Sequence, residues 1–66
     1  MFIMNRIKEV LVEKGVKQIW LAEKIGKSFN TVNSYVQNRK QLRLEVLHKI
    51  ADILDVDVKS LIVSNK

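Results

Sequence analysis

The chain has no cysteine, and for so short a protein that absence limits the folds it can adopt. At 66 residues, a domain buries only about 60% of the surface that its unfolded chain exposes. Domains of this size usually gain stability from disulfides, a structural metal or oligomerisation. Without cysteine, disulfides, thiolate metal sites and thiol catalysis are excluded. The sequence therefore predicts a single domain over residues 1–66, with an apolar core and self-association as its remaining source of stability.

The composition excludes several further classes of protein. Apolar residues make up 47% of the chain, which is typical of a globular domain and too high for a disordered one. No apolar run approaches the roughly 18 residues of a membrane span, and the N-terminus lacks the features of a secretory signal. Two glycines leave no room for a Gly-rich phosphate loop. We expect a cytoplasmic protein that does not enter a membrane.

Positive charge is concentrated in the middle of the chain. The formal net charge is +5, yet residues 14–43 hold seven lysines and arginines against Glu23 alone. Such a segment on a small domain indicates a polyanionic partner, most commonly nucleic acid. A solvated face that only maintains solubility gives the same pattern. Because Gly26 interrupts the segment, it is not the continuous basic helix that would bind a membrane surface.

Apolar residues recur at helical spacing in four stretches of the sequence. We expect Gly15 and Gly26 to end the first two helices, and Asn38 to end the third in the left-handed conformation that asparagine tolerates. Ser28 is expected to cap the start of the third helix. The apolar positions are Ile3, Ile7, Val10 and Leu11; Leu21, Ala22 and Ile25; Val32, Tyr35 and Val36; and Leu47, Ile50, Ala51 and Leu54.

A fifth, shorter helix is expected near the C-terminus, where Asp57 can cap it and Leu61 and Ile62 can face inward. Residues 38–43 predict a basic loop before the fourth helix. Strand signals are weak, since one alternation of three residues is too short for a strand and no hairpin turn accompanies it. The predicted fold class is therefore all-α, a compact bundle of about five short helices.

The second and third predicted helices share a short turn that contains Gly26, as in a helix-turn-helix. Ala22 is small enough to let the third helix approach closely, and Val32 packs from the other side. The outer face of the third helix carries short amides and hydroxyls where an ordinary solvated helix has Lys and Glu. Asparagine and glutamine can bond adenine in a bidentate way, and a helix fits the major groove. A polar helix with caps at both ends is the alternative. Together with the basic flanks, the pattern favours DNA.

In order and in register, these residues resemble the lambda-repressor/Cro-like (XRE) helix-turn-helix family over residues 5–62. The resemblance implies a five-helix bundle that acts as a homodimer on a near-palindromic operator, with half-sites about 34 Å apart as in lambda repressor and Cro. It implies a sequence-specific double-stranded DNA-binding transcriptional regulator, specifically a repressor. The matching positions are Asn5–Lys8, Gly15, Gln18, Leu21–Gly26, Ser28, Thr31–Val32, Tyr35 and Leu47–Val56.

The resemblance also implies roles for individual residues. The expected base-reading positions are Phe29, Asn30, Asn33 and Ser34. Phe29 has no hydrogen-bonding group, so it would pack against thymine methyl groups or else against the bundle. Contacts to the DNA backbone, which position a protein without reading sequence, are expected from Lys17, Gln18, Lys27, Ser28, Thr31, Asn38, Arg39, Lys40 and Arg43. Lys17 and Lys27 could instead be merely solvated, and Thr31 could bond a carbonyl of its own helix.

Departures from the family pattern leave a second hypothesis open. Lys17 stands where a Ser or Thr cap is usual, and Ile19 and Trp20 stand at positions that are usually polar. Trp20 is either part of a contact surface or partly buried under a lysine stem. With the apolar ends at residues 2–4 and 61–63, these residues support a protein-interaction module of the same fold that has a protein partner and weak or lost DNA binding. For the DNA-binding hypothesis, the resemblance implies dimer contacts in the fifth helix and the C-terminal segment, Leu61 included.

Catalysis and metal binding have little support. His48 is the single histidine of the chain, and only Glu45 and Asp52 share its helix face. A structural metal site requires four ligands, so we expect no metal and no cofactor. No set of nucleophile, base and oxyanion donor can be assembled, and the sequence does not predict an enzyme.

Overall fold

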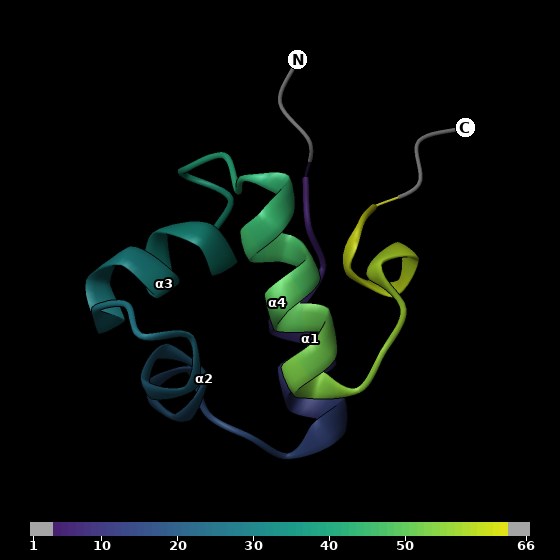
Figure 1. Cartoon of the computed structure of the whole chain (residues 1–66), viewed down its shortest axis with the longest axis horizontal. Helices are drawn as coiled ribbons and strands as arrows, with labels where there is room; N and C mark the ends of the chain where they lie inside the picture. Colours follow the sequence, from purple (N-terminus) through teal and green to yellow (C-terminus); the bar gives the residue numbers. More distant parts are fainter. Residues whose placement is uncertain (1–3, 64–66) are drawn as a thin grey trace.

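The computed structural model describes residues 4–63, which form four α-helices and one 3-10 turn (Figure 1). The elements are α1 (Ile7–Lys14), α2 (Gln18–Ile25), α3 (Phe29–Val36), α4 (Leu44–Leu54) and the 3-10 turn η1 (Val58–Leu61). Figure 1 shows α4 lying across α1 at the centre, with α2 and α3 on one side and η1 on the other. This arrangement leaves α3 at the edge of the bundle, with one face free.

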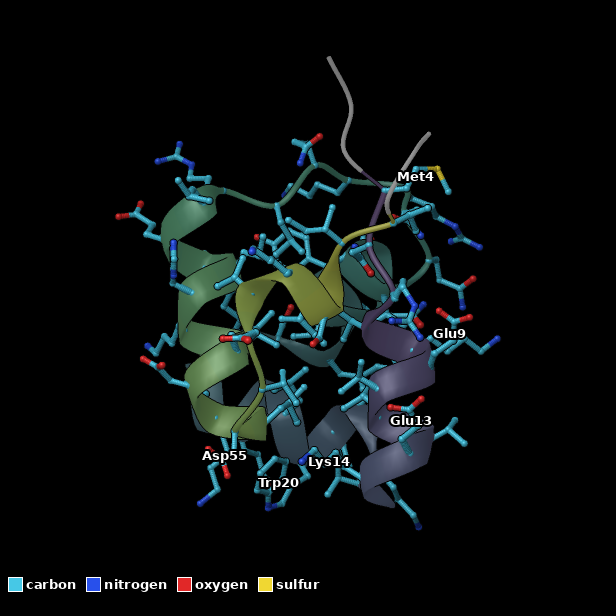
Figure 2. The ribbon with its side chains drawn as sticks, turned by 90° about the vertical axis from the view of Figure 1, so that its right-hand side faces the viewer. Met4, Glu9, Glu13, Lys14, Trp20 and Asp55 are labelled. Atoms are coloured by element: carbon cyan, nitrogen blue, oxygen red, sulfur yellow. The ribbon has the colours of Figure 1, made fainter. Side chains whose placement is uncertain are left out.

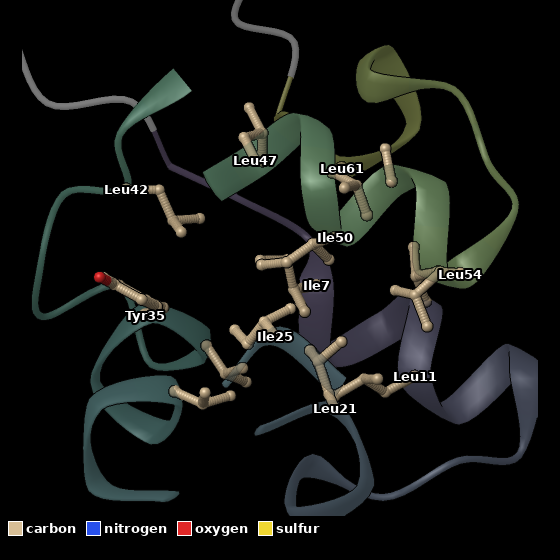
Figure 3. Packing of buried hydrophobic residues seen from close by; sticks show 14 of the residues in the cluster. Ile7, Leu11, Leu21, Ile25, Tyr35, Leu42, Leu47, Ile50, Leu54 and Leu61 are labelled. Carbon is tan, nitrogen blue, oxygen red and sulfur yellow. The ribbon is translucent and has the colours of Figure 1, made fainter. Parts of the chain in front are cut away.

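All described members of the four predicted apolar stripes are buried, and they form one core (Figure 3). Leu61 closes the core from η1. Leu42 is buried as well, although the sequence placed it in a basic loop. Helical periodicity could not identify Leu42, because a loop residue has no periodic neighbours and its burial depends on how the loop crosses from α3 to α4.

The helix ends confirm several sequence predictions. Gly15 and Gly26 adopt left-handed φ angles of 70° and 73° after α1 and α2. Asn38 has a φ of 61° in the turn that follows α3, and Asp55 has a φ of 58° after α4. A left-handed residue lets a backbone N–H turn back to the last carbonyls of its helix. The turn between α2 and α3 and the exit from α3 therefore each contain a left-handed residue at the expected position.

The chain ends differ from the sequence prediction. The expected fifth helix is a 3-10 turn of four residues, and Asp57 makes no side-chain cap there. A count of five helices is therefore slightly too high. The first helix begins at Ile7, and Ile3 lies outside the described residues. Residues 4–6 are not helical because their backbone pairs elsewhere: Arg6 N–H donates to Leu61 O at 2.8 Å, and Val63 N–H donates to Met4 O at 3.0 Å.

Asn5 joins this N-terminal segment to the end of α3. Its side-chain Nδ2 donates to Tyr35 O at 2.8 Å, and its Oδ1 accepts from Ile7 N–H at 3.1 Å. Its backbone N–H donates to Asn38 Oδ1 at 2.8 Å, while Asn38 Nδ2 donates to Asn5 O at 3.2 Å. We call these two residues the Asn5–Asn38 pair. The pair holds the C-terminal end of α3 against a segment more than thirty positions earlier in the chain.

Candidate nucleic-acid interface

Helices α2 and α3 form a helix-turn-helix. Gly26 N–H and Lys27 N–H both donate to Ala22 O, at 3.0 and 3.1 Å, and so turn the chain at the end of α2. Ala22 and Val32 are buried, as the predicted close approach of the two helices requires. The two helices together place the outer face of α3 on the surface of the molecule. The class of protein that this arrangement defines is a helix-turn-helix domain with α3 as its second helix.

The four predicted base-reading residues lie together on α3. Phe29 and Asn30 are exposed at the start of the helix, and Asn33 and Ser34 are half-buried one turn later. Gln37, which follows α3, donates from Nε2 to Asn33 Oδ1 at 3.5 Å. Residues three and four positions apart share a helix face, which is why the sequence pattern could group these side chains. The face offers amide and hydroxyl groups at one end and an aromatic ring beside them.

The start of α3 carries the predicted cap. Ser28 Oγ accepts from Thr31 N–H at 3.2 Å, and the Ser28 hydroxyl donates to Thr31 Oγ1 at 2.9 Å. The two hydroxyls therefore bond to one another, and Ser28 satisfies one N–H group of the first turn. Ser28 is exposed and Thr31 is half-buried. The hydrogen bonds that Ser28 makes at this end of α3 all lie within four residues of sequence.

The start of α2 has no such cap. Lys17 precedes the helix in an extended conformation and makes no side-chain cap hydrogen bond. The N–H groups of a first helical turn have no partner inside their helix. Among the described residues, Gln18 Oε1 is the one buried side-chain oxygen without a hydrogen-bond partner. An uncapped helix start beside a lysine is a favourable place for an anion, because free N–H groups and the helix dipole both favour negative charge.

Unpaired positive charge lies at both ends of α3. Five of the predicted backbone-contact residues are exposed cations: Lys17, Lys27, Arg39, Lys40 and Arg43. Within residues 4–63, Arg43 alone among them has an acidic partner, Glu45, at 4.0 Å and with both side chains exposed. Figure 2 views the molecule from the side away from α3 and shows Glu9 and Glu13 on α1 together with Asp55. The excess positive charge of the chain lies in residues 14–43, which include α2 and α3.

Two residues behave differently from the sequence prediction. The carboxamide of Asn38 is engaged at both its oxygen and its nitrogen by the backbone of Asn5, so it has internal partners in addition to the predicted DNA contact. Asn5 itself is 8% exposed; in the sequence it is a position that matches the family pattern, without a role of its own. An asparagine just before an apolar periodic segment is a helix-start signal, and this signal could have identified it.

Trp20 is half-buried, and Lys24 Nζ lies 5.5 Å from the centroid of its ring. This geometry confirms the expected burial under a lysine stem and adds a cation–π contact. Ile19 next to it is exposed. The apolar surface that supported the interaction hypothesis therefore comes from Ile19 more than from Trp20.

Comparison with known proteins identifies the family. Residues 6–66 match the family model of the Cro/C1-type helix-turn-helix DNA-binding domain. The chain is also similar to a crystal structure of a "putative DNA-binding protein" from Bacteroides fragilis, with 45% identity, a TM-score of 0.90, and coverage of 94% of this chain and 100% of that chain. No curated protein matches the sequence. The chain belongs to the Cro/C1-type helix-turn-helix family of DNA-binding domains.

The family match confirms the predicted resemblance and the all-α fold. Domains of this family are typically binding modules rather than enzymes. Residues 4–63 contain no group of three or more His, Cys, Asp or Glu side chains arranged to hold a metal ion. None of the helices in this range has the length and apolar character that a membrane crossing requires.

Proposed function

We propose that this protein is a sequence-specific transcriptional regulator that inserts α3 into the major groove of double-stranded DNA. The observation that carries the proposal is the outer face of α3, where Phe29, Asn30, Asn33 and Ser34 lie together between two groups of exposed cations. In helix-turn-helix proteins, the first residues of the second helix contact base edges. The similar protein from Bacteroides fragilis, described as a "putative DNA-binding protein", supports the same assignment.

The backbone contacts divide between the two ends of α3. Lys17, Gln18, Lys27, Ser28 and Thr31 flank its start, and we assign them to phosphates on that side. Asn38, Arg39, Lys40 and Arg43 flank its end. Arg39 and Lys40 are exposed, whereas Asn38 reaches a phosphate only at the expense of its bonds to Asn5. We therefore assign to Asn38 mainly the placement of the two cations that follow it.

We further propose a homodimer that represses transcription by occupying a near-palindromic operator in the cytoplasm. Leu61, which the sequence placed at the dimer contacts, has 0% exposure and belongs to the core. Exposed apolar side chains nearby are Met4, Leu44 and Val63. These residues support a contact at this edge of the molecule, so a dimer is better tested with Leu44→Asp than with a substitution of Leu61. Loss of the dimer mass in Leu44→Asp, with an unchanged fold, is the expected result.

The experiment that tests DNA recognition is selection from a random duplex library at about 0.15 M salt. Two half-sites about one helical turn apart are the expected outcome for a dimer. On that operator, Asn30→Ala and Ser34→Ala should each relax the preference for one base pair, by about 1–3 kcal/mol. Glu13→Gln on the far face (Figure 2) is the matched control and should leave binding unchanged.

A protein-interaction module of the same fold is the second candidate function. Val12, Ile19 and Phe29 are all exposed, and exposed apolar surface can mark a contact with another protein. Selection that enriches no sequence, with only weak and salt-sensitive binding left, would overturn the DNA proposal in favour of this one. In that case, Asn30→Ala and Arg39→Ala would also leave binding to the protein partner unchanged.

A further inference from the structure

The C-terminal end of α3 receives a hydrogen bond from a distant segment of the chain. The last four carbonyls of a helix have no partner within it, and in α3 Tyr35 O is one of them. This oxygen accepts from Asn38 N–H at 3.0 Å and from Asn5 Nδ2 at 2.8 Å. The first donor lies in the turn that follows the helix, whereas the second lies thirty positions away in the sequence. Asn5 therefore ties this end of α3 to the start of the chain's described part.

The segment that contains Asn5 is itself fixed on its other side. Arg6 N–H donates to Leu61 O at 2.8 Å, and Arg6 Nη1 donates to Ser60 O at 3.2 Å. Within the Asn5 side chain, Oδ1 accepts from Ile7 N–H at 3.1 Å. This second bond orients the carboxamide, so that Nδ2 is directed at α3. Asn5 thus has the buried and fixed position that an anchor for another element requires.

The placement of α3 matters most for hydrogen bonds to bases. Asn30, Asn33 and Ser34 lie on one helix of eight residues, so a shift at its C-terminal end moves all three together. An N–H···O bond spans only about 2.7–3.2 Å, and binding groups must be held within about 0.5 Å of their working positions. Lysine and arginine reach phosphates with long, flexible side chains. The contacts to phosphates therefore tolerate a shift that the contacts to bases do not.

We infer that Asn5 is a positioning residue for DNA recognition, which sets through its bond to Tyr35 O where α3 lies in the major groove. This inference rests on the proposed function. Sequence-specific affinity depends on base contacts, whereas sequence-independent affinity comes from positive charge on phosphates. Loss of the bond should lower the first and leave the second. The ratio of specific to non-specific affinity is therefore the quantity that reports the role of Asn5.

Asn5→Asp separates the two bonds of the side chain. Aspartate keeps an oxygen that accepts from Ile7 N–H, and it caps a helix start as well as asparagine does. It has no N–H group to donate to Tyr35 O. On the operator obtained by selection, we expect the affinity to fall about tenfold for each half-site, which corresponds to the loss of one base contact. Affinity for random-sequence duplex should change less than about twofold, with an unchanged slope of log affinity against log salt.

Three further variants separate placement from stability and charge. Asn5→Ala carries no charge and also loses the bond to Ile7, and it should show the same loss of specific affinity. Asn38→Gly is a milder change that tolerates the positive φ and breaks the bonds of Asn38 to Asn5, so it should lower the ratio in the same direction. Leu54→Ala removes core packing from α4 and should lower the thermal midpoint while keeping the native ratio. All affinities are measured where circular dichroism shows the variant to be folded.

The outcomes separate this inference from the proposed function. If the ratio stays within twofold of the native value in the variants of Asn5 and Asn38, the inference is overturned and the DNA-binding proposal stands. The same conclusion follows if Leu54→Ala lowers the ratio as much as they do, because the loss would then follow stability and not placement. If the native protein selects no sequence from the library, the proposed function fails and this inference fails with it.

Discussion

The two ends of α3 are held in different ways. At its C-terminal end, Asn38 and Tyr35 are bonded to Asn5, so this end is tied to a distant part of the chain. At its N-terminal end, the hydrogen bonds come from Ser28 and Thr31 within the same turn. The residues that we assign to the bases begin at this second end. The residues that hold α3 in place are therefore different from the residues that we assign to base contacts, and the two sets can be substituted separately.

The largest effect on stability should follow removal of the Asn5 side chain. Asn5→Ala leaves Tyr35 O and Ile7 N–H without their partner in a buried place. A buried polar group that loses its partner costs about 1–3 kcal/mol, so we expect the free energy of unfolding to fall by about 3 kcal/mol in a urea titration. A loss below about 0.5 kcal/mol would show that the end of α3 is not held by this residue.

Substitution of Asn38 separates backbone strain from the bonds of the Asn5–Asn38 pair. Asn38→Gly loses both side-chain bonds but tolerates the positive φ, and we expect a loss of about 1 kcal/mol. Asn38→Ala loses the same bonds and adds about 1–2 kcal/mol of strain in the left-handed conformation. The difference between the two variants in urea unfolding measures the strain minus the roughly 0.4–1 kcal/mol by which alanine lowers the entropy of the unfolded chain. Equal losses would contradict the assignment of a strained position.

A smaller effect is expected at the opposite end of α3. Ser28→Ala removes the cap that accepts from Thr31 N–H, and such caps contribute about 1 kcal/mol. Ser28→Asp, which can also cap, should keep the stability but weaken DNA binding through its negative charge. A stability loss in Ser28→Ala as large as that in Asn5→Ala would show that the local cap stabilises α3 as much as the long-range bonds of Asn5 do.

Arg39→Ala should have the smallest effect on the fold, because the side chain is exposed and has no ion-pair partner within residues 4–63. We expect a change in unfolding free energy within about 0.5 kcal/mol. Binding should weaken on all DNA sequences, and the slope of log affinity against log salt should decrease by about one. A loss confined to one operator sequence would instead make Arg39 a base-reading residue.

Local patterns in the sequence predicted much of the fold and the candidate face of α3. The apolar stripes, the glycine-containing turn and the Ser28 cap each depend on residues within about four positions, so the sequence carries them directly. The bond from Asn5 to Tyr35 and the burial of Leu42 could not be predicted in this way, because both depend on segments that only the folded chain brings together. The same holds for the contacts of η1 and the residues after it with residues 4–6, which lie more than fifty positions earlier in the chain.

The contact between the chain's two end segments has a consequence for the order of folding. Arg6 Nη1 donates to Ser60 O at 3.2 Å, across 54 positions of sequence. Closing so long a loop costs a few kcal/mol of conformational entropy, roughly (3/2)RT ln n for n residues, and a single hydrogen bond contributes only about 1 kcal/mol. We expect this contact to form after the helices have packed and to open before they separate. Because Asn5 lies in the same segment, hydrogen exchange at the Asn5 and Arg6 amides should then report how often the C-terminal end of α3 separates from Asn5.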